Sequence, residues 1–182
     1  KAYFILFSLA FLLSSGSMQA QVKKEKLTRA QKKELKQQKK EQRIATVIKA
    51  LNDTTYVLEA DYLGNRRGQR VSVNSTINFV LVNKGEAIFQ FGSAHSVGYN
   101  GVGGATVEGT ITNYELTQRK NGESYFIRLT ISSSLGFFDI TLDIGSTGNA
   151  SATVHTNTRH RLSYSGKVAP LSESGIYKGM SR

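Results

Sequence analysis

An alternation of apolar and polar residues with a period of two, repeated between Thr54 and Val168, constrains the fold of this chain most strongly. Successive side chains of a β-strand point to opposite faces, so each alternating run predicts a strand with one buried and one solvated face. Turn-forming residues separate the runs, as at Asn83-Lys84-Gly85 and Asn121-Gly122. Eight or nine such strands without a helical pattern between them predict an antiparallel β-barrel or sandwich.

The glycine-rich stretch from Gly98 to Tyr114 lies in the middle of this pattern. Four glycines open it, and Gly109 follows inside a strand, on the same apparent face as Val107 and Ile111. A strand that omits a side chain from its inward face either admits another backbone or ring there, or opens onto a cavity. We therefore select a candidate ligand-binding set in and beside this loop, consisting of Tyr99, Asn100, Gly101, Gly104 and Gly109.

The basic residues are concentrated before the β-region. The whole chain has 24 Lys and Arg against 13 Asp and Glu, and residues 21–50 hold eleven basic and three acidic residues, a net charge of +8 in thirty positions. The chain has no cysteine, which excludes disulfides, thiolate metal sites and lipid attachment through cysteine.

The N-terminal residues 1–20 have the order of a secretory signal peptide. Lys1 precedes a run of twelve apolar and small residues, and small residues then lead to an expected cleavage after Ala20. The alternative is an uncleaved membrane anchor, although twelve residues are short for a membrane span. The sequence thus predicts a periplasmic or secreted protein with no transmembrane span after cleavage.

Residues 21–52 have helical composition, and Thr28 with Gln31 forms a capping-box pattern. We expect residues 21–43 to be a basic helical arm and the last turns to dock on the sheet through Ile44, Val47, Ile48 and Leu51. The arm is either a solvated tether or a contact for anionic lipid or polysaccharide of the cell envelope. The residues predicted to make that contact are Lys32, Lys33, Lys36, Lys39, Lys40 and Arg43.

Four segments together resemble a DUF4251-type domain, a family of small exported proteins of Bacteroidota with no assigned function. They are IKALNDTTYVLEADYLG, NFVLVNKGEAIFQFG, GYNGVGGATVEGTITNYEL and LSYSGKVAP, and they span about Ala45 to Pro170. The resemblance implies a mainly β, lipocalin-like antiparallel barrel of eight or nine strands, and it transfers no catalytic residue. We place the barrel domain at residues 44–170 and a flexible tail at 171–182.

The remaining chemistry of the sequence argues against an enzyme. The glycine loop lacks the Lys and the following helix of a phosphate-binding loop. The three histidines have neither metal-ligand spacing nor a paired nucleophile, so we expect no metal, no cofactor and no catalytic site. The arm has no aromatic residue, so nucleic acid is not expected as a partner.

The prediction from sequence is therefore an exported, non-enzymatic envelope barrel that binds an apolar or glycan ligand or an envelope partner. The alternatives are a structural spacer tethered to anionic surfaces by its basic helix and, less favoured, a hydrolase.

Overall fold

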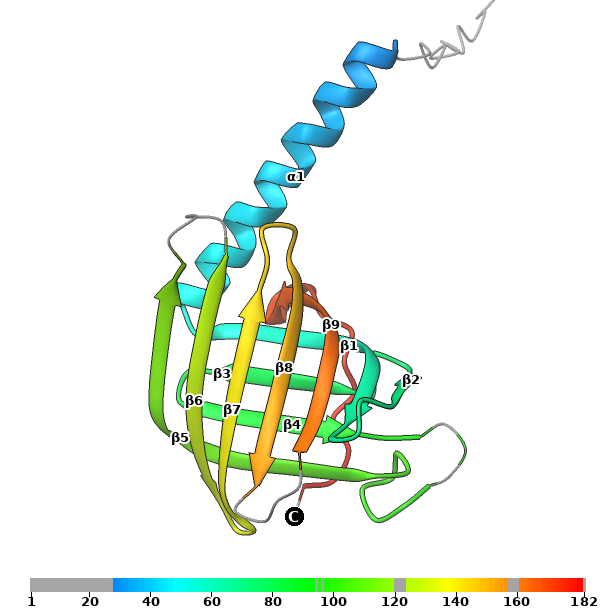
Figure 1. Cartoon of the computed structure of the whole chain (residues 1–182), viewed down its shortest axis with the longest axis vertical. Coiled ribbons are helices and arrows are strands. Elements are labelled where there is room, and N and C mark those ends of the chain that lie inside the picture. Colours follow the sequence, from blue (N-terminus) through cyan, green and yellow to red (C-terminus); the bar gives the residue numbers. More distant parts are fainter. Residues whose placement is uncertain (1–27, 94, 96, 120–123, 157–160, 182) are drawn as a thin grey trace, which may run out of the picture.

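The structure is a computed structural model that describes residues 28–93, 95, 97–119, 124–156 and 161–181. The expected signal peptide, the first residues of the arm and the Asn121-Gly122 turn lie outside these residues. Within these residues, one α-helix precedes a mainly β domain (Figure 1). The elements are α1 (Arg29–Asn52), β1 (Thr55–Asn65), β2 (Arg70–Ser72), β3 (Phe79–Asn83), β4 (Glu86–Phe91), β5 (Ala105–Gln118), β6 (Tyr125–Ser133), β7 (Gly136–Ile144), β8 (Asn149–Thr156), β9 (Arg161–Pro170) and the short 3₁₀ helix η1 (Leu171–Glu173).

Eight of the nine strands form a closed antiparallel barrel. The order is β2-β1-β3-β4-β5-β6-β7-β8-β9, and a further pairing of β1 with β9 closes the sheet. Strand β2 is an extra strand that pairs with the second half of β1. Closure pairs the backbone N–H and C=O groups that the edge strands of an open sheet would leave unpaired. The predicted barrel is confirmed, and the choice between barrel and sandwich is settled by the β1–β9 pairing.

The inward-facing residues of the strands form the main core. An eight-stranded barrel has an interior of the size that side chains can fill. The main core of this barrel includes large side chains that are fully buried. Within it, the rings of Phe89 and Phe138 pack edge to face, with ring centroids 5.0 Å apart. The largest fully buried side chains of this core are Tyr56, Tyr164, Leu51, Leu58, Ile127, Leu129, Ile131, Ile140, Leu142 and Ile144.

Gly109 allows β5 to pass close to β6. A Cβ at this position would lie 2.5 Å from the backbone oxygen of Ser132, so no side chain fits without a shift of the strands. The pairing register of β5 with β6 also changes between Ile111 and Asn113, two residues further on. Of the two explanations that the sequence offers for Gly109, the structure supports close packing by a neighbouring backbone.

Helix α1 begins as the sequence predicts. The Thr28 side chain accepts a hydrogen bond from the Gln31 backbone N–H, and the Gln31 side chain accepts one from the Thr28 N–H. The docked surface differs in part from the expected stripe. Val47 and Leu51 are buried together with Ala50, whereas Ile44 and Ile48 are only half-buried because they lie toward the side of this contact.

The C-terminal segment 171–181 is not the loose tail that its polar composition suggests. It runs over the outer face of the barrel, where Ile176 packs against a second small core of Val57, Phe79 and Ile88. The Tyr177 N–H donates to the carbonyl of Thr76 at 2.8 Å, so backbone pairing adds to this packing. The sequence predicts a flexible tail here, whereas the structure packs residues 171–181 on the sheet, because outward-facing apolar residues give the segment a surface to cover.

Candidate functional site

Asn100 organises the glycine loop between β4 and β5. Its side-chain oxygen accepts hydrogen bonds from the backbone N–H groups of Val102 at 3.1 Å and Gly104 at 3.0 Å. Asn100 is 3% exposed, so these bonds satisfy a buried amide oxygen. At Gly104 a Cβ would collide with the carbonyl of Phe91, which explains the requirement for glycine at this position.

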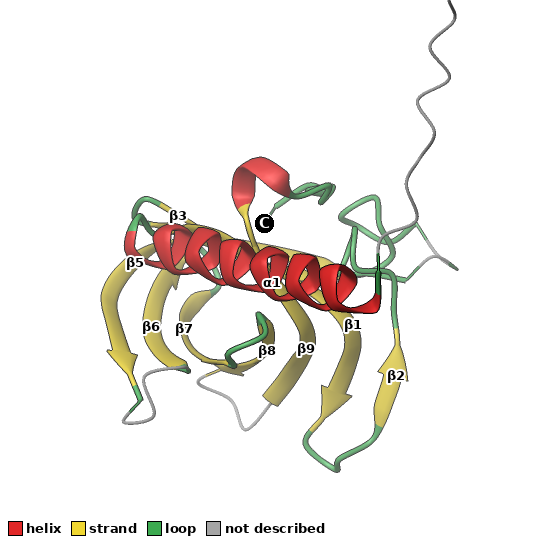
Figure 2. Cartoon of the chain, turned by 90° about the horizontal axis from the view of Figure 1, so that it is seen from above, coloured by secondary structure: helices red, strands yellow, loops and turns green. Residues whose placement is uncertain are grey.

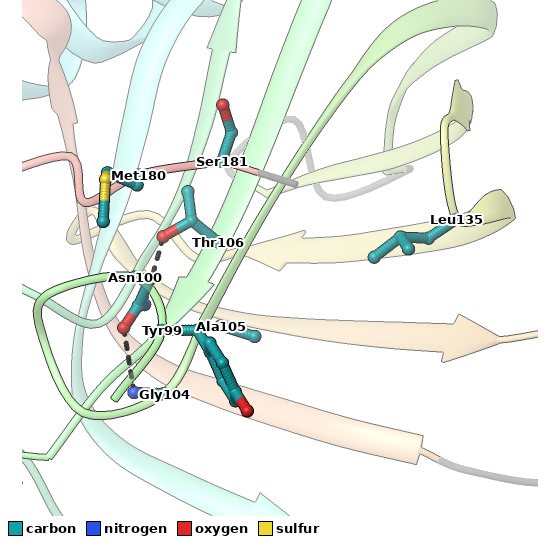
Figure 3. A pocket seen from close by; sticks show the side chains of 8 residues that line it. All are labelled: Tyr99, Asn100, Gly104, Ala105, Thr106, Leu135, Met180 and Ser181. Carbon is teal, nitrogen blue, oxygen red and sulfur yellow. Dashed lines mark hydrogen bonds between the residues drawn. The ribbon is translucent and has the colours of Figure 1, made fainter. Parts of the chain in front are cut away.

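A buried polar network connects this loop to the C-terminal segment. The Asn100 amide donates to the Thr106 hydroxyl at 3.1 Å, and that hydroxyl donates to the Gln90 side-chain oxygen at 2.7 Å (Figure 3 shows the first bond). The Gln90 amide donates to the carbonyls of Ile77 and Tyr177. The network is satisfied by these bonds, so it holds loop and tail together as one rigid surface.

The C-terminal residues complete that surface. The Gly179 N–H donates to the Gln90 side-chain oxygen at 2.8 Å, and the Met180 N–H donates to the Asn100 carbonyl at 3.0 Å. Lys178 forms an ion pair with Glu108 at 2.6 Å, and its hydrogen bond lowers the pKa of the Glu108 carboxyl.

A hollow of about 230 Å³ lies beside the loop (Figure 3). Three of its side chains are largely exposed, namely Tyr99 at 83%, Met180 at 69% and Leu135 at 52%. Two of the polar side chains of its lining, Asn100 and Thr106, already hydrogen-bond within the protein. The hollow therefore offers an aromatic ring and apolar chains for contact. Its complete lining is Tyr99, Asn100, Gly104, Ala105, Thr106, Leu135, Met180 and Ser181.

The structure brings together only part of the ligand-binding set selected from sequence. Tyr99, Asn100 and Gly104 line the hollow, and Gly101 is an exposed turn residue with φ of 76°. Gly109 lines a different, more open depression with Ser132 and Ser133. Sequence reasoning missed Gln90 and Thr106, and their place as polar residues inside strands is the signal that could have identified them.

The described residues contain no group of three or more His, Cys, Asp or Glu side chains that could hold a metal ion. His95 and His155 are both exposed, and His160 lies outside the described residues. Among the helices that the structure describes, none has the length and apolarity needed to span a membrane.

The second candidate site is the basic half of α1, residues Arg29–Arg43, which is exposed along its entire length. All six cations predicted to contact an anionic surface lie on it, together with Arg29. Within the part of the chain that the structure describes, none of these seven residues forms an ion pair, since the two ion pairs there are Arg119–Asp143 and Lys178–Glu108.

The charges of α1 are separated by face. Residues three or four positions apart are neighbours on a helix, and the spacing of the seven cations places them in one continuous stripe. They are Arg29, Lys32, Lys33, Lys36, Lys39, Lys40 and Arg43. Within α1, neither Glu34 nor Glu41 stands three or four residues from a Lys or Arg, so neither can neutralise the stripe. We call these seven residues the basic stripe.

Lys39 and Arg43 also border a hollow of about 390 Å³ between α1 and the end of the barrel. Gln42, Thr46 and Val47 complete the helix side, and the opposite wall comes from the end of β9 and from η1. We call this hollow the wedge. Its opposite wall is Val168, Ala169, Pro170 and Glu173.

Fold and surface define a class of small antiparallel barrel proteins with a docked N-terminal helix and a C-terminal segment bound across the outer face of the sheet. The chain belongs to the DUF4251 family, described as a domain of unknown function, whose model matches residues 38–168. It is similar to a DUF4251 family protein from Bacteroides eggerthii DSM 20697, whose crystal structure has been determined. The two chains are 31% identical with a TM-score of 0.62, over 77% of this chain and 95% of the other. A comparison with curated proteins found no match.

Proposed function

We propose that this protein is an exported, non-enzymatic protein of the cell envelope that binds an anionic component of the envelope through the basic stripe of α1. The signal-peptide pattern of residues 1–20 supports export. The match to a protein from Bacteroides is consistent with an envelope of the kind that this proposal requires.

The separation of charges on α1 carries the proposal. Like charges spaced three or four residues apart destabilise a helix by roughly 0.2–0.5 kcal/mol per pair, and opposite charges at that spacing stabilise it by a similar amount. A helix that serves only as a solvated tether gains stability from mixed charges. In α1 the cations repel one another on one face, so the arrangement lowers the stability of the free helix and favours an anionic partner.

The glycine-loop hollow supports a second candidate function, binding of an apolar or glycan ligand against Tyr99, Leu135 and Met180. The observation in its favour is the gathering of these exposed side chains around a rigid loop. Lys178 does not line this hollow, but it stands two residues before Met180, which does, so labelling of Lys178 reports binding close to the hollow.

Covalent mapping distinguishes the two functions. Polygalacturonate, a linear acidic polysaccharide, is activated with a carbodiimide, so that its carboxyl groups form amides with nearby lysine amines. Peptide mass spectrometry then locates the adducts. We expect adducts on Lys32, Lys36 and Lys39 at low salt and their loss at high salt, because salt screens exposed charges. Exposed Lys84 and Lys167 are the internal controls.

Adducts concentrated on Lys178 would instead favour the glycine-loop hollow as a glycan site. Equal labelling of the α1 lysines and of Lys84 and Lys167 would overturn the proposal of a specific anionic contact.

A further inference from the structure

The basic stripe lies on the same face of α1 as the residues that dock on the barrel. Arg43, Val47, Ala50 and Leu51 follow one another at spacings of three and four residues, so the stripe continues directly into the buried docking face of α1. The lining of the wedge agrees with this geometry, because Lys39 and Arg43 lie opposite the end of β9. Figure 1 shows α1 rising from one end of the barrel, and Figure 2 shows it running across that end.

This orientation matters for the shape of the partner. A flat membrane can contact many side chains of a helix at once only where nothing else protrudes on that side. Here the barrel protrudes on the side of the stripe, because the same helix face docks on it. A thin chain, by contrast, can enter the wedge and follow the stripe, which runs for about 21 Å from Arg29 to Arg43 at the helical rise per residue.

The composition of α1 also argues against insertion into a bilayer. Helices that lie in a membrane interface present a broad apolar face opposite their charges. Between Arg29 and Arg43 the only large apolar residue is Leu35, and the remaining positions hold Gln, Glu and one Ala beside the cations. No apolar face is therefore available in this half of the helix.

The wedge combines two kinds of group that suit an acidic sugar polymer. Arg43 and Lys39 supply cations, and a guanidinium binds a carboxylate or phosphate through two parallel hydrogen bonds. Gln42 and Thr46 supply neutral hydrogen-bonding side chains beside them, which suit sugar hydroxyls. Glu173 on the opposite wall is exposed and repels an anion, so the acidic groups of the polymer should lie against the helix.

We infer that the anionic partner is a linear acidic polysaccharide that lies along the barrel-facing side of α1, with one part seated in the wedge between Lys39, Arg43 and the β9–η1 end. This inference rests on the proposed function and names both the chemical class of the partner and its position.

The test uses the full chain and measures binding of a fluorescent polygalacturonate oligomer by anisotropy. The variant Lys39→Gln/Arg43→Gln should weaken binding about tenfold, because charge-assisted hydrogen bonds are lost. The matched control Arg66→Gln/Arg67→Gln removes two exposed charges from the β1–β2 turn and should change binding by about twofold at most. Glu173→Gln should tighten binding about twofold, because it removes a repulsive charge from the wedge.

Vesicles rich in phosphatidylglycerol are the comparison probe. We expect weaker binding of vesicles than of the oligomer, with no response to Glu173→Gln. Vesicle binding as tight as oligomer binding would contradict the inference. So would equal effects of the Lys39/Arg43 variant and its control, or no effect of Glu173→Gln on oligomer binding. If one of these results is found but activated polygalacturonate still labels the α1 lysines, only the inference about the polysaccharide is overturned, and the proposed anionic contact of the basic stripe stands. If neither labelling of the α1 lysines nor binding of the oligomer is detected, both proposals are overturned.

Discussion

The hydroxyl of Tyr164 lies inside the barrel with no hydrogen-bond partner among the described residues. Tyr164 faces the small side chain of Ala152 on β8, which leaves room for its ring. A buried polar group without a partner costs roughly 1–3 kcal/mol. We therefore expect Tyr164→Phe to raise the free energy of unfolding by about 1 kcal/mol in urea denaturation. A loss of stability would show that the hydroxyl has a partner in solution, and the half-exposed Tyr62→Phe serves as the control.

Because Tyr164 is buried, we also expect the free energy of unfolding to depend on pH in the alkaline range. Burial raises the pKa of Tyr164, and burial followed by the neighbouring Tyr114 hydroxyl raises the pKa of Tyr56. In the unfolded chain tyrosine loses its proton near pH 10, whereas the folded chain retains it. Stability is thus unaffected below about pH 10 and falls above it, by about 1.4 kcal/mol per pH unit for each buried tyrosine. Tyr164→Phe should make this fall less steep in unfolding measured between about pH 9 and 11.

At the scale of single elements, α1 is held by its last turns. Leu51 is 1% exposed, and its backbone carbonyl accepts a hydrogen bond from the Tyr114 hydroxyl of β5 at 3.3 Å. We expect Leu51→Ala to cost about 2–5 kcal/mol, as measured for large-to-small changes in packed cores. Ile48→Ala should cost clearly less, because Ile48 is only half-buried. If urea denaturation shows equal costs, or a change at Leu51 below about 0.5 kcal/mol, α1 is not packed as the structure describes.

Local signals in the sequence predicted the start of this helix and part of its docking face, but not the packing of the C-terminal segment. The Thr28 capping box and the apolar spacing from Val47 to Leu51 involve residues close together in the chain, so pattern alone reveals them. The tail depends on Gln90, which binds Tyr177 and Gly179 far along the chain. Such long-range pairs leave no local period, so the polar composition of residues 171–182 gives no sign of this packing.

At the scale of the whole molecule, period-two alternation predicted every described strand of the barrel but not how the sheet closes. A sandwich and a barrel share the same alternation, and the β1–β9 pairing that distinguishes them joins the two ends of the domain. Likewise, the sequence predicted the basic residues of the arm but not their direction. That direction depends on the packing of Val47, Ala50 and Leu51 against the barrel, because these three residues share one face of α1 with the basic stripe.

The central claim is that the basic stripe binds an anionic polymer of the envelope. Its most direct test is the affinity of the full chain for polygalacturonate when the six cations Lys32, Lys33, Lys36, Lys39, Lys40 and Arg43 are replaced by Gln, which retains helix propensity. Circular dichroism of the variant is the control for a folded helix and barrel.

For the unaltered protein we predict binding that weakens steeply with salt, and for the six-Gln variant a loss of affinity of at least about a hundredfold at low salt. Equal affinity of the two proteins, with the same dependence on salt, would contradict the account.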